Sequence, residues 1–194
     1  IIIGGAVLLK DSSPKDNYVA VGQNSRKLNP SIAKTIGLNQ KEFKACLSSG
    51  KYTAKVQADV DDGVKAGVTG TPSSFILKDG VVVDMIQGAQ PLEVVKQQID
   101  QAINGGTKIP NQVRRVTADE HILGNPTAQI IIVEYSDLEC PFCKVFHNTM
   151  HEIIKTNPNV AWVYRHYPIP QLHAKAFKEA EATECAWEQG GNDS

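Results

Sequence analysis

Apolar residues recur along this chain with two periods, one typical of helices and one typical of strands, and they divide it into two blocks. The first block, residues 28–104, predicts the order helix, helix, strand, strand, helix. In its first helix, within "LNQKEFKACL", Asn39 stands three residues before Glu42, as in a capping box. The second helix has an apolar residue at every fourth position, which is helical spacing: Val56, Val60 and Val64.

The rest of the first block predicts a hairpin followed by a helix. Two apolar runs, "SSFIL" and "VVVDMI", flank "KDG", and Asp-Gly is a strong signal for a tight turn between antiparallel strands. Pro91 is suited to the first turn of a helix. This helix is expected to direct four apolar side chains inward: Leu92, Val95, Ile99 and Ile103.

A linker at residues 105–112, "GGTKIPNQ", leads into the second block, residues 113–194. This block predicts a strand "IIIVEY", a helix from Pro141, a strand "VAWVYR" and a helix from about His173. Strand, helix and strand in this order are typical of a βαβ unit in a central sheet, so the predicted fold class is α/β. The helix after Pro141 has its apolar residues on one face: Phe142, Val145, Phe146, Met150, Ile153 and Ile154.

Residues 1–27 belong to neither block. They open with nine almost purely apolar residues, "IIIGGAVLL", which cannot span a bilayer because that takes about 20. The run is either a buried strand or the end of a truncated signal peptide or membrane anchor. The polar stretch "KDSSPKDN" behind it favours the export segment, so residues 1–27 are interpreted as a signal or anchor remnant with a linker.

Composition narrows the class of protein without fixing its chemistry. A chain of 194 residues, 41% apolar and 21% charged, suits one domain or one domain with an inserted subdomain. Its net charge is -1 and no run of Lys or Arg stands out, so we expect no nucleic-acid partner.

The candidate chemistry lies in "YSDLECPFCKVFHN", where two residues separate Cys140 from Cys143. Cys140 is expected at a helix N-terminus, where backbone N–H groups and the helix dipole favour a thiolate. Cys143, one turn later, is placed to attack a mixed disulfide formed at Cys140. The sequence pattern by itself is also compatible with a metal clip or an inert structural bridge.

A zinc site is the main alternative for this pair. A four-ligand site usually needs a second close pair, but Cys46 and Cys185 are single and far apart in the sequence. His147 and His151 fall on the same predicted helix and could be further ligands, although surface histidines are commoner. A C-x-x-C beside a βαβ pattern favours a redox couple, and we expect neither a metal nor a cofactor.

Several stretches together resemble DsbA-like thiol:disulfide oxidoreductases, a branch of the thioredoxin fold. The stretch "ADEHILGNPTAQIIIVEYSDLECPFCKVFHNTM" is similar to the start of the family's catalytic domain. "YRHYPIPQLHAKAFKEAEATECAWEQGG" resembles its next strand and the opening of an inserted helical subdomain, and "IGLNQKEFKACLSSGKY" resembles a later part of that insertion. "GVTGTPSSFILKDGVVVDMIQGAQPLEVVKQQID" resembles its closing section. The resemblance implies a thioredoxin-like α/β fold with an inserted helical subdomain.

The order of the halves departs from that family, in which the CPFC half comes first and the Thr-Pro half last. Here the Thr-Pro half occupies residues 28–104 and the CPFC half residues 113–194. The order resembles a circular permutation cut inside the helical insertion, which is feasible where the old termini lie close together at the surface. A rearranged or misassembled gene, or halves swapped between two chains, would give the same sequence.

The resemblance implies a role for each residue of the motifs. Cys140 corresponds to the cysteine that forms the mixed disulfide with a client protein, and Cys143 corresponds to the buried resolving cysteine. The Thr-Pro pair corresponds to a loop whose cis-proline faces the disulfide and helps to dock an extended client strand. The residues expected to contact the client are Thr71, Pro72, Pro141 and Phe142.

Glu134 is a carboxylate within the apolar run "IIIVEY". A carboxyl group in an apolar strand should have a raised pKa and could relay a proton for Cys143, and the family often has a buried acid at this position. The alternative is a glutamate on an edge strand that faces water. Asp137 and Glu139, which are closer to the motif, are expected to face solvent.

Cys46 and Cys185 fall on helices that the resemblance assigns to the insertion. They are either two buried free thiols or a structural disulfide, and four cysteines in an exported protein favour the disulfide. The predicted function is an enzyme that exchanges disulfides with exported client proteins in the periplasm or cell envelope, served by a membrane or soluble redox partner. The alternative is a non-catalytic thioredoxin-fold module that binds proteins or holds a metal.

Overall fold

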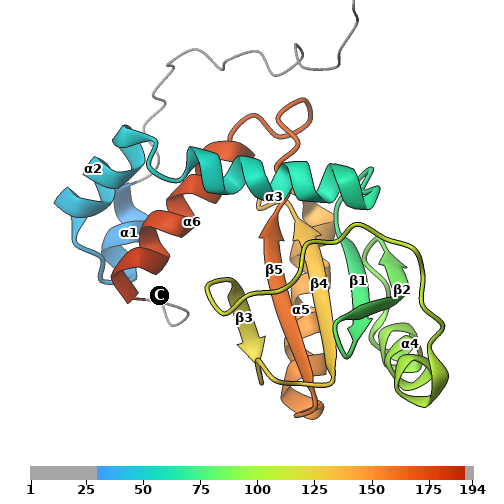
Figure 1. Cartoon of the computed structure of the whole chain (residues 1–194). Coiled ribbons are helices and arrows are strands. Elements are labelled where there is room, and N and C mark those ends of the chain that lie inside the picture. The colour runs from blue at the N-terminus through green and yellow to red at the C-terminus, as the bar shows by residue number, and fades with distance from the viewer. Residues whose placement is uncertain (1–29, 191–194) are drawn as a thin grey trace, which may run out of the picture. The chain divides into compact units, whose positions relative to one another are not determined.

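The computed structural model describes residues 30–190 (Figure 1). The chain divides into two units, Ile1–Pro30 and Ser31–Ser194, and the fold below is that of the second. The interpretation of residues 1–27 as a signal or anchor remnant lies outside the described residues.

A five-stranded sheet forms the centre of the fold, with the strand order β2-β1-β4-β5-β3 (Figure 1). The strands are β1 (Ser73–Lys78), β2 (Val81–Gln87), β3 (His121–Gly124), β4 (Ile130–Ser136) and β5 (Val160–His166). Strands β4 and β5 are parallel, and the other neighbouring strands are antiparallel. Together with the helices that cover it, this sheet confirms the predicted α/β class.

The turn between β1 and β2 follows directly from the sequence. Asp79 and Gly80 both adopt left-handed backbone conformations, with φ of 52° and 78°. A two-residue turn with positive φ at both positions matches the twist of the strands that it joins, and Asp-Gly tolerates it well. The predicted hairpin at "KDG" is therefore confirmed.

The two blocks of the sequence meet in the middle of the sheet. Strand β1 from the first block pairs along its whole length with β4 from the second, from Ser73 opposite Tyr135 to Lys78 opposite Ile130. The runs "SFIL" and "IIIVEY" are thus paired within a single chain. The circularly permuted origin of this order stays a prediction.

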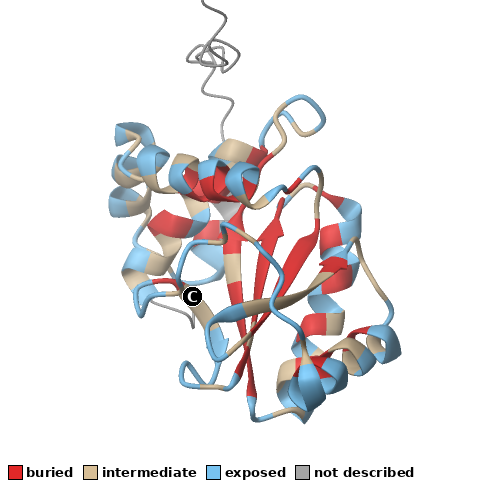
Figure 2. Cartoon of the chain, turned by 45° about the vertical axis from the view of Figure 1, so that its right-hand side comes forward, coloured by how far each residue is buried: buried red, intermediate tan, exposed pale blue. Residues whose placement is uncertain are grey.

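Two helices, α4 (Leu92–Gly105) and α5 (Pro141–Thr156), pack on one face of the sheet. The side chains buried there come from four strands and both helices, and they include Ile76, Ile86, Val95, Ile99, Ile132, Phe146, Met150 and Trp162. The opposite face is covered by the end of α3 (Thr53–Ala66) and by residues 113–116. Figure 2 shows the buried residues gathered in the central strands, with the outer surfaces of the helices exposed.

Two further helices, α2 (Gln40–Ser49) and α6 (Ala176–Gly190), lie against each other beside the sheet (Figure 1). The side chain of Asn39 caps α2 by accepting hydrogen bonds from two backbone N–H groups, as its sequence predicts. A disulfide joins Cys46 of α2 to Cys185 of α6, with an S–S distance of 1.99 Å and a Cα–Cα distance of 5.9 Å. The structure therefore contains the disulfide that was favoured over two buried free thiols.

A buried ion-pair network fixes α3 to the sheet. Arg165 of β5 donates from Nη1 to Asp62 of α3 at 2.7 Å and from Nε to Glu120 at 2.8 Å. The hydroxyl of Tyr135 on β4 also donates to Asp62. Removing one member of a buried pair leaves an uncompensated charge and typically costs about 3–5 kcal/mol, so these contacts are specific constraints on where α3 lies.

The sequence patterns misplace some elements and faces. They do not predict β3 or the short α1 (Pro30–Thr35), and α6 begins at Ala176 instead of about His173. Side chains expected in the core but exposed in the structure are Val64 (59%), Ile103 (40%), Phe142 (65%) and Val145 (60%).

The physical reasons for these exposed side chains are simple. Residues spaced by four are rotated by about 40° per step around a helix axis. Val64 and Ile103 are the last residues of their series, so they point away from the buried face on which the series begins. Phe142 and Val145 lie in the first turns of α5, next to the end of β4.

No helix among residues 30–190 is long and apolar enough to cross a membrane.

Candidate active site

Cys140 lies at the junction of the central strand β4 and the helix α5. Strand β4 ends at Ser136, and the following turn makes Cys140 the N-cap of α5, with an extended backbone (φ -75°, ψ 121°). Pro141 occupies the first turn of α5, where its missing N–H has no intrahelical partner to lose. The predicted position of Cys140 at a helix N-terminus is therefore confirmed.

The Thr71–Pro72 loop lies directly against the sulfur of Cys140. The Cys140 thiol donates to the backbone oxygen of Thr71, with an Sγ to O distance of 3.5 Å. The Thr71–Pro72 peptide bond is cis. The loop is held in place because the Gly88 N–H donates to the Pro72 carbonyl at 2.9 Å. The fold thus brings the predicted residues of the two sequence halves to one place.

Cys143 lies one turn into α5 and is only 5% exposed. Its sulfur accepts a hydrogen bond from the backbone N–H of Asp137, with an N to Sγ distance of 3.5 Å. Burial raises the pKa of the Cys143 thiol to about 11, although this N–H group and the hydroxyl of Ser136 act in the opposite direction. Both cysteines of the motif are free thiols. At neutral pH, Cys143 is therefore a protonated thiol.

Glu134 is 1% exposed and lies in a central strand, so the alternative of an edge-strand glutamate that faces water is wrong. Burial raises the pKa of its carboxyl group to about 7, against the lowering effects of Ser136 and Trp162. Neither carboxyl oxygen has a partner at normal hydrogen-bond geometry among the described residues. A carboxyl group with this pKa can give or take a proton near neutral pH.

Ser136 is a residue that the sequence analysis does not single out. It lies two positions after Glu134, on the same side of β4, and is 4% exposed. Its hydroxyl lowers the pKa of both the Glu134 carboxyl and the Cys143 thiol, so it lies close to both groups. The period-two alternation along "IIIVEYS" is the signal that could have placed Ser136 beside Glu134.

The expectation that Asp137 faces solvent is wrong, because this residue is only 1% exposed. Its side chain accepts hydrogen bonds from the N–H groups of Glu139 and Ile169, both at 2.8 Å, and contacts His173 Nδ1 at 2.9 Å. These bonds compensate the buried carboxylate and fix the turn that carries Cys140. Glu139 is half-buried and accepts a hydrogen bond from the Lys175 N–H at 2.7 Å.

Apolar side chains project from the surface next to the cysteine pair. Phe142, between the two cysteines, is 65% exposed, and Leu138, two residues before Cys140, is 43% exposed. Pro141 is also exposed, whereas Pro72 is buried and Thr71 is half-buried. An exposed apolar group of this kind is suited to contact a partner chain, and the expected role of Phe142 stays a prediction.

The structure also shows where possible metal ligands come together. Among residues 30–190, the one convergent group of three His, Cys, Asp or Glu ligand atoms is His121, His166 and Glu184, which excludes both cysteines. His147 and His151, the further ligands considered from the sequence, face each other on α5 with their Nε2 atoms 2.9 Å apart.

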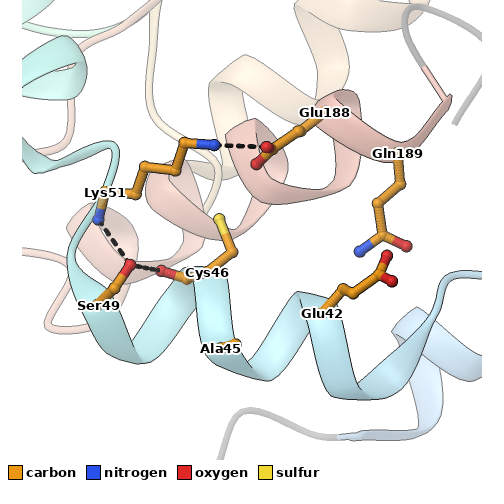
Figure 3. A pocket seen from close by; sticks show the side chains of 7 residues that line it. All are labelled: Glu42, Ala45, Cys46, Ser49, Lys51, Glu188 and Gln189. Carbon is orange, nitrogen blue, oxygen red and sulfur yellow. Dashed lines mark hydrogen bonds and ion pairs between the residues drawn. The ribbon is translucent and has the colours of Figure 1, made fainter.

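A pocket of about 550 Å³ lies beside the Cys46–Cys185 disulfide, between α2 and α6 (Figure 3). Lys51 and Glu188 form an ion pair at its wall, and Glu42 and Gln189 face each other at the other end (Figure 3). Its lining contains none of the residues around Cys140 and Cys143.

Comparisons with protein families match the two sequence blocks separately. Residues 116–193 match a family described as thioredoxin, and residues 17–100 match a family described as a DSBA-like thioredoxin domain. Cys140 lies in the first of these ranges and Pro72 in the second. The two matches support a DsbA-like thioredoxin-fold family for this chain. The family resemblance and the thioredoxin-like fold predicted from the sequence are thus confirmed.

Part of the chain also resembles segments of much longer proteins. One stretch of 72 residues is 38% identical to the Na(+)/H(+) antiporter NhaA 1 of Mycolicibacterium gilvum. The chain is also 38% identical over 71 residues to the Na(+)/H(+) antiporter NhaA 3 of Salinispora tropica. Each stretch covers 37% of this chain but only 12% and 11% of the respective antiporter. Because the chain spans about an eighth of these relatives, their antiport activity is not assigned to it.

Proposed function

We propose that this chain exchanges disulfides with exported client proteins through Cys140 and Cys143. A DsbA-like domain supports a thiol:disulfide oxidoreductase in general. The observation that carries the specific proposal is the contact of the Cys140 thiol with the Thr71 carbonyl, 3.5 Å away. Cys140 is 6% and Cys143 5% exposed, so this geometry places a pair of buried free thiols beside a loop with a cis-proline.

In the oxidising direction, a client thiolate attacks Cys140 Sγ of the Cys140–Cys143 disulfide. The S–S bond breaks, a client–Cys140 disulfide forms, and Cys143 leaves as a thiolate. Because burial raises the pKa of Cys143 to about 11, this thiolate takes up a proton, which Glu134 can supply. A second client thiolate then attacks the client sulfur of the mixed disulfide, which releases the client disulfide and the Cys140 thiolate.

In the reducing direction the same groups act in reverse order. The Cys140 thiolate attacks a client disulfide, and one client sulfur leaves as a thiolate. Cys143 then loses its proton to Glu134 and attacks Cys140 Sγ of the mixed disulfide, which frees the second client sulfur. The proximity of Ser136 to both Glu134 and Cys143 supports a short proton path between them. No bound cofactor is needed for either direction.

The proposed client contacts come from the loop and the helix start on either side of Cys140. We infer that Thr71 and Pro72 dock an extended client segment, while Pro141 and Phe142 pack on its side chains. The exposed ring of Phe142 supports this assignment. Recognition of main chain and apolar side chains suits an enzyme that must act on many unfolded or partly folded clients.

The Cys46–Cys185 disulfide supports an oxidising location for this chain. Structural disulfides form and persist in the periplasm and at the cell surface and are rare in the cytosol. We infer that the clients are exported proteins and that a membrane or soluble redox partner resets the Cys140–Cys143 pair.

We further infer that the order of the halves reflects a circular permutation within the helical insertion. Strands β1 and β4 complete one sheet inside one chain, and the linker at residues 105–112 joins their blocks. This inference accounts for a complete active site in spite of the reversed order.

The proposed exchange is tested with three single substitutions. Cys140→Ser should abolish insulin reduction and oxidative refolding of a client, because it removes the attacking sulfur. Cys143→Ser should trap client–Cys140 mixed disulfides, visible on non-reducing gels. Lys144→Ser, at an exposed neighbouring position of α5, serves as the control and should keep full activity. Full exchange activity in Cys140→Ser would contradict the proposed function.

A further inference from the structure

A second cluster of reactive side chains lies where β3, β5 and α6 meet. His121 begins β3, His166 ends β5, and Glu184 lies in α6; the pairing of β3 with β5 brings the two histidines together. The Nε2 atoms of His121 and His166 are 2.6 Å and 3.1 Å from the same oxygen, Glu184 Oε1. All three ligand atoms lie within 4.8 Å of one another.

The three atoms converge as the ligands of one metal ion do. Atoms bound to a tetrahedral Zn²⁺ at about 2.0–2.1 Å lie roughly 3.3 Å apart, so small side-chain rotations would seat an ion. Imidazole nitrogen and carboxylate oxygen are donors that zinc and similar divalent ions prefer. We propose that His121, His166 and Glu184 bind one divalent transition-metal ion such as Zn²⁺.

The surroundings hold these ligands in place. His166 is 2% exposed and the Glu184 side chain is fully buried. The second carboxylate oxygen, Glu184 Oε2, accepts a hydrogen bond from Lys55 Nζ at 2.7 Å, which leaves Oε1 for the ion. The next residue, Cys185, is fixed to α2 by its disulfide. A ligand held by outer partners in this way is the usual arrangement of a metal site.

The ammonium group of Lys55 is an opposing charge, since its Nζ lies 3.4 Å from His121 Nε2. Its side chain is 32% exposed, so it can turn toward water while keeping its stem in place. The buried carboxylate has no such freedom. The ion of charge +2 at Oε1 and the mobile ammonium group at Oε2 therefore share one fixed carboxylate, and the ammonium group can move away.

The cluster opens onto a cavity of about 280 Å³, which gives an ion a way in and leaves the fourth coordination position for water. His147 and His151 line the same cavity and form a separate pair of ligands on α5. Two exposed imidazoles hold a metal less firmly than two imidazoles and a buried carboxylate. The proposed ion therefore belongs at His121, His166 and Glu184.

Calorimetric titration with Zn²⁺ tests the site in the full chain. The protein is first oxidised at Cys140–Cys143, so that neither thiol can act as a ligand. We expect one Zn²⁺ per chain, with Mg²⁺ giving no heat of binding because it prefers oxygen ligands. His121→Gln and Glu184→Gln should each lower the Zn²⁺ affinity by more than about tenfold. The double variant His147→Gln/His151→Gln is the matched control and should keep the affinity.

A spectroscopic readout locates the ion independently. Trp162 and Trp187 are the two tryptophans of the chain; Trp187 lies 5.1 Å from His121, and Trp162 lies 5.1 Å from His147, between ring centroids. In the Trp162→Phe variant, Cu²⁺ at the proposed site should quench Trp187 fluorescence at one equivalent, and His121→Gln should abolish this quenching.

Three results would overturn the proposal. One is the absence of Zn²⁺ binding up to millimolar concentration, and another is unchanged affinity in His121→Gln with a native circular dichroism spectrum. The third is loss of the ion in His147→Gln/His151→Gln, which would assign it to the α5 pair. Because oxidised protein is used and exchange is not measured, these outcomes are separate from failure of the proposed disulfide exchange.

Discussion

At the scale of single residues, two buried carboxyl groups near the cysteine pair differ in their hydrogen-bond partners and therefore in the role that each can play. Asp137 accepts hydrogen bonds from two backbone N–H groups and contacts His173, so its charge is compensated. Glu134 is buried to the same degree, but its oxygens have no such bonds to the described residues, and burial raises its pKa to about 7. One carboxylate therefore fixes a turn, while the other is available for proton transfer.

Glu134→Gln should stabilise the fold and slow the exchange reaction. The pKa of Glu134 rises from 4.5 to about 7 on folding, so the folded chain binds more protons than the unfolded chain in this interval. The stability contribution of Glu134 is thus fully present below pH 4.5 and is lost as pH rises through about 7. Relative to wild type, the variant should gain on the order of 3 kcal/mol above pH 7 and nothing near pH 4.

Urea unfolding of the reduced protein across this pH range measures the gain, and quenched-flow assays measure release of the mixed disulfide. Release should be slower in Glu134→Gln, because no group then takes the Cys143 proton. Glu152→Gln, which removes a charge from the surface of α5, should change neither quantity. A stability difference that does not vary with pH, or an unchanged release rate, would contradict the assigned role of Glu134.

At the scale of elements, the packing of α3 depends on one glycine. Gly63 faces the sheet, and a Cβ atom at this position would lie 2.6 Å and 2.7 Å from two ring atoms of Tyr167 and 3.0 Å from Tyr135. The Tyr167 ring cannot easily give way, because its hydroxyl donates to the Val68 carbonyl at 3.0 Å. Glycine lowers the helix propensity of α3, but its missing side chain allows α3 to pack closely against the sheet.

Gly63→Ala should therefore destabilise the fold although alanine is the better helix former. Helix propensity would contribute a gain of about 1 kcal/mol, but overpacking in a fixed core costs about 1–3 kcal/mol. We expect a net loss of roughly 1–2 kcal/mol in the free energy of unfolding, measured by chemical denaturation. Val64→Ala, at the exposed neighbouring position, is the control and should change stability by less than about 0.5 kcal/mol. A stabilised Gly63→Ala variant would show that α3 is not held this closely.

Periodicity located most elements, but it could not show where each element meets its neighbours. The βαβ unit around Cys140 and the hairpin at Asp79–Gly80 followed from local patterns, because turn chemistry and strand alternation act over a few residues. Strand β3 is only four residues long and has no comparable local signal. The burial of Asp137 depends on Ile169 and His173, which the fold brings from more than 30 residues away.

The cluster of His121, His166 and Glu184 could not be predicted from the sequence, because its residues also come together only in the folded chain. Its ligands come from two strands and a helix, and the sequence spacing of such residues follows no metal-binding pattern. The cysteine pair, by contrast, lies within four residues at one helix end, so its geometry is fixed locally. A family resemblance was needed to connect Cys140 with Pro72, because 67 residues of chain separate them.

At the scale of the whole molecule, the two sequence blocks depend on each other. The central pairing of β1 with β4 joins them, and so does the Cys46–Cys185 disulfide, whose cysteines are 139 positions apart. A bridge that closes a loop of this length restricts the unfolded chain strongly, which typically stabilises a fold by about 2–4 kcal/mol. The proposed active site likewise needs both blocks, since Thr71 comes from one and Cys140 from the other.

The contacts between α2 and α6 make the proposed permutation testable. The Asn39 N–H donates to Gln189 Oε1 at 2.8 Å, and Gln189 Nε2 donates to the Asn39 carbonyl at 3.4 Å. The end of α6 therefore lies next to the start of α2. A flexible Gly/Ser linker of about 12 residues from Gly190 is long enough to reach Pro30, nine positions before Asn39.

A chain that starts at Thr107, passes through this linker from Gly190 to Pro30 and ends at Gly106 should therefore fold. It restores the order in which the CPFC half precedes the Thr-Pro half. We expect it to be monomeric, to form the Cys46–Cys185 disulfide and to reduce insulin as fast as residues 30–190 in their original order. Its free energy of unfolding should differ by no more than about 1 kcal/mol, because closing one surface loop and opening another have similar entropies.

The matched control in this comparison is the 30–190 chain itself, which lacks the same terminal residues. Light scattering, mass spectrometry of the disulfide and the insulin assay give three separate readouts. A rearranged chain that fails to fold would contradict the permutation, because a direct connection from the end of α6 to the helices before β1 would then be incompatible with the fold. A chain that is active only as a dimer would instead show that the two halves are completed between molecules.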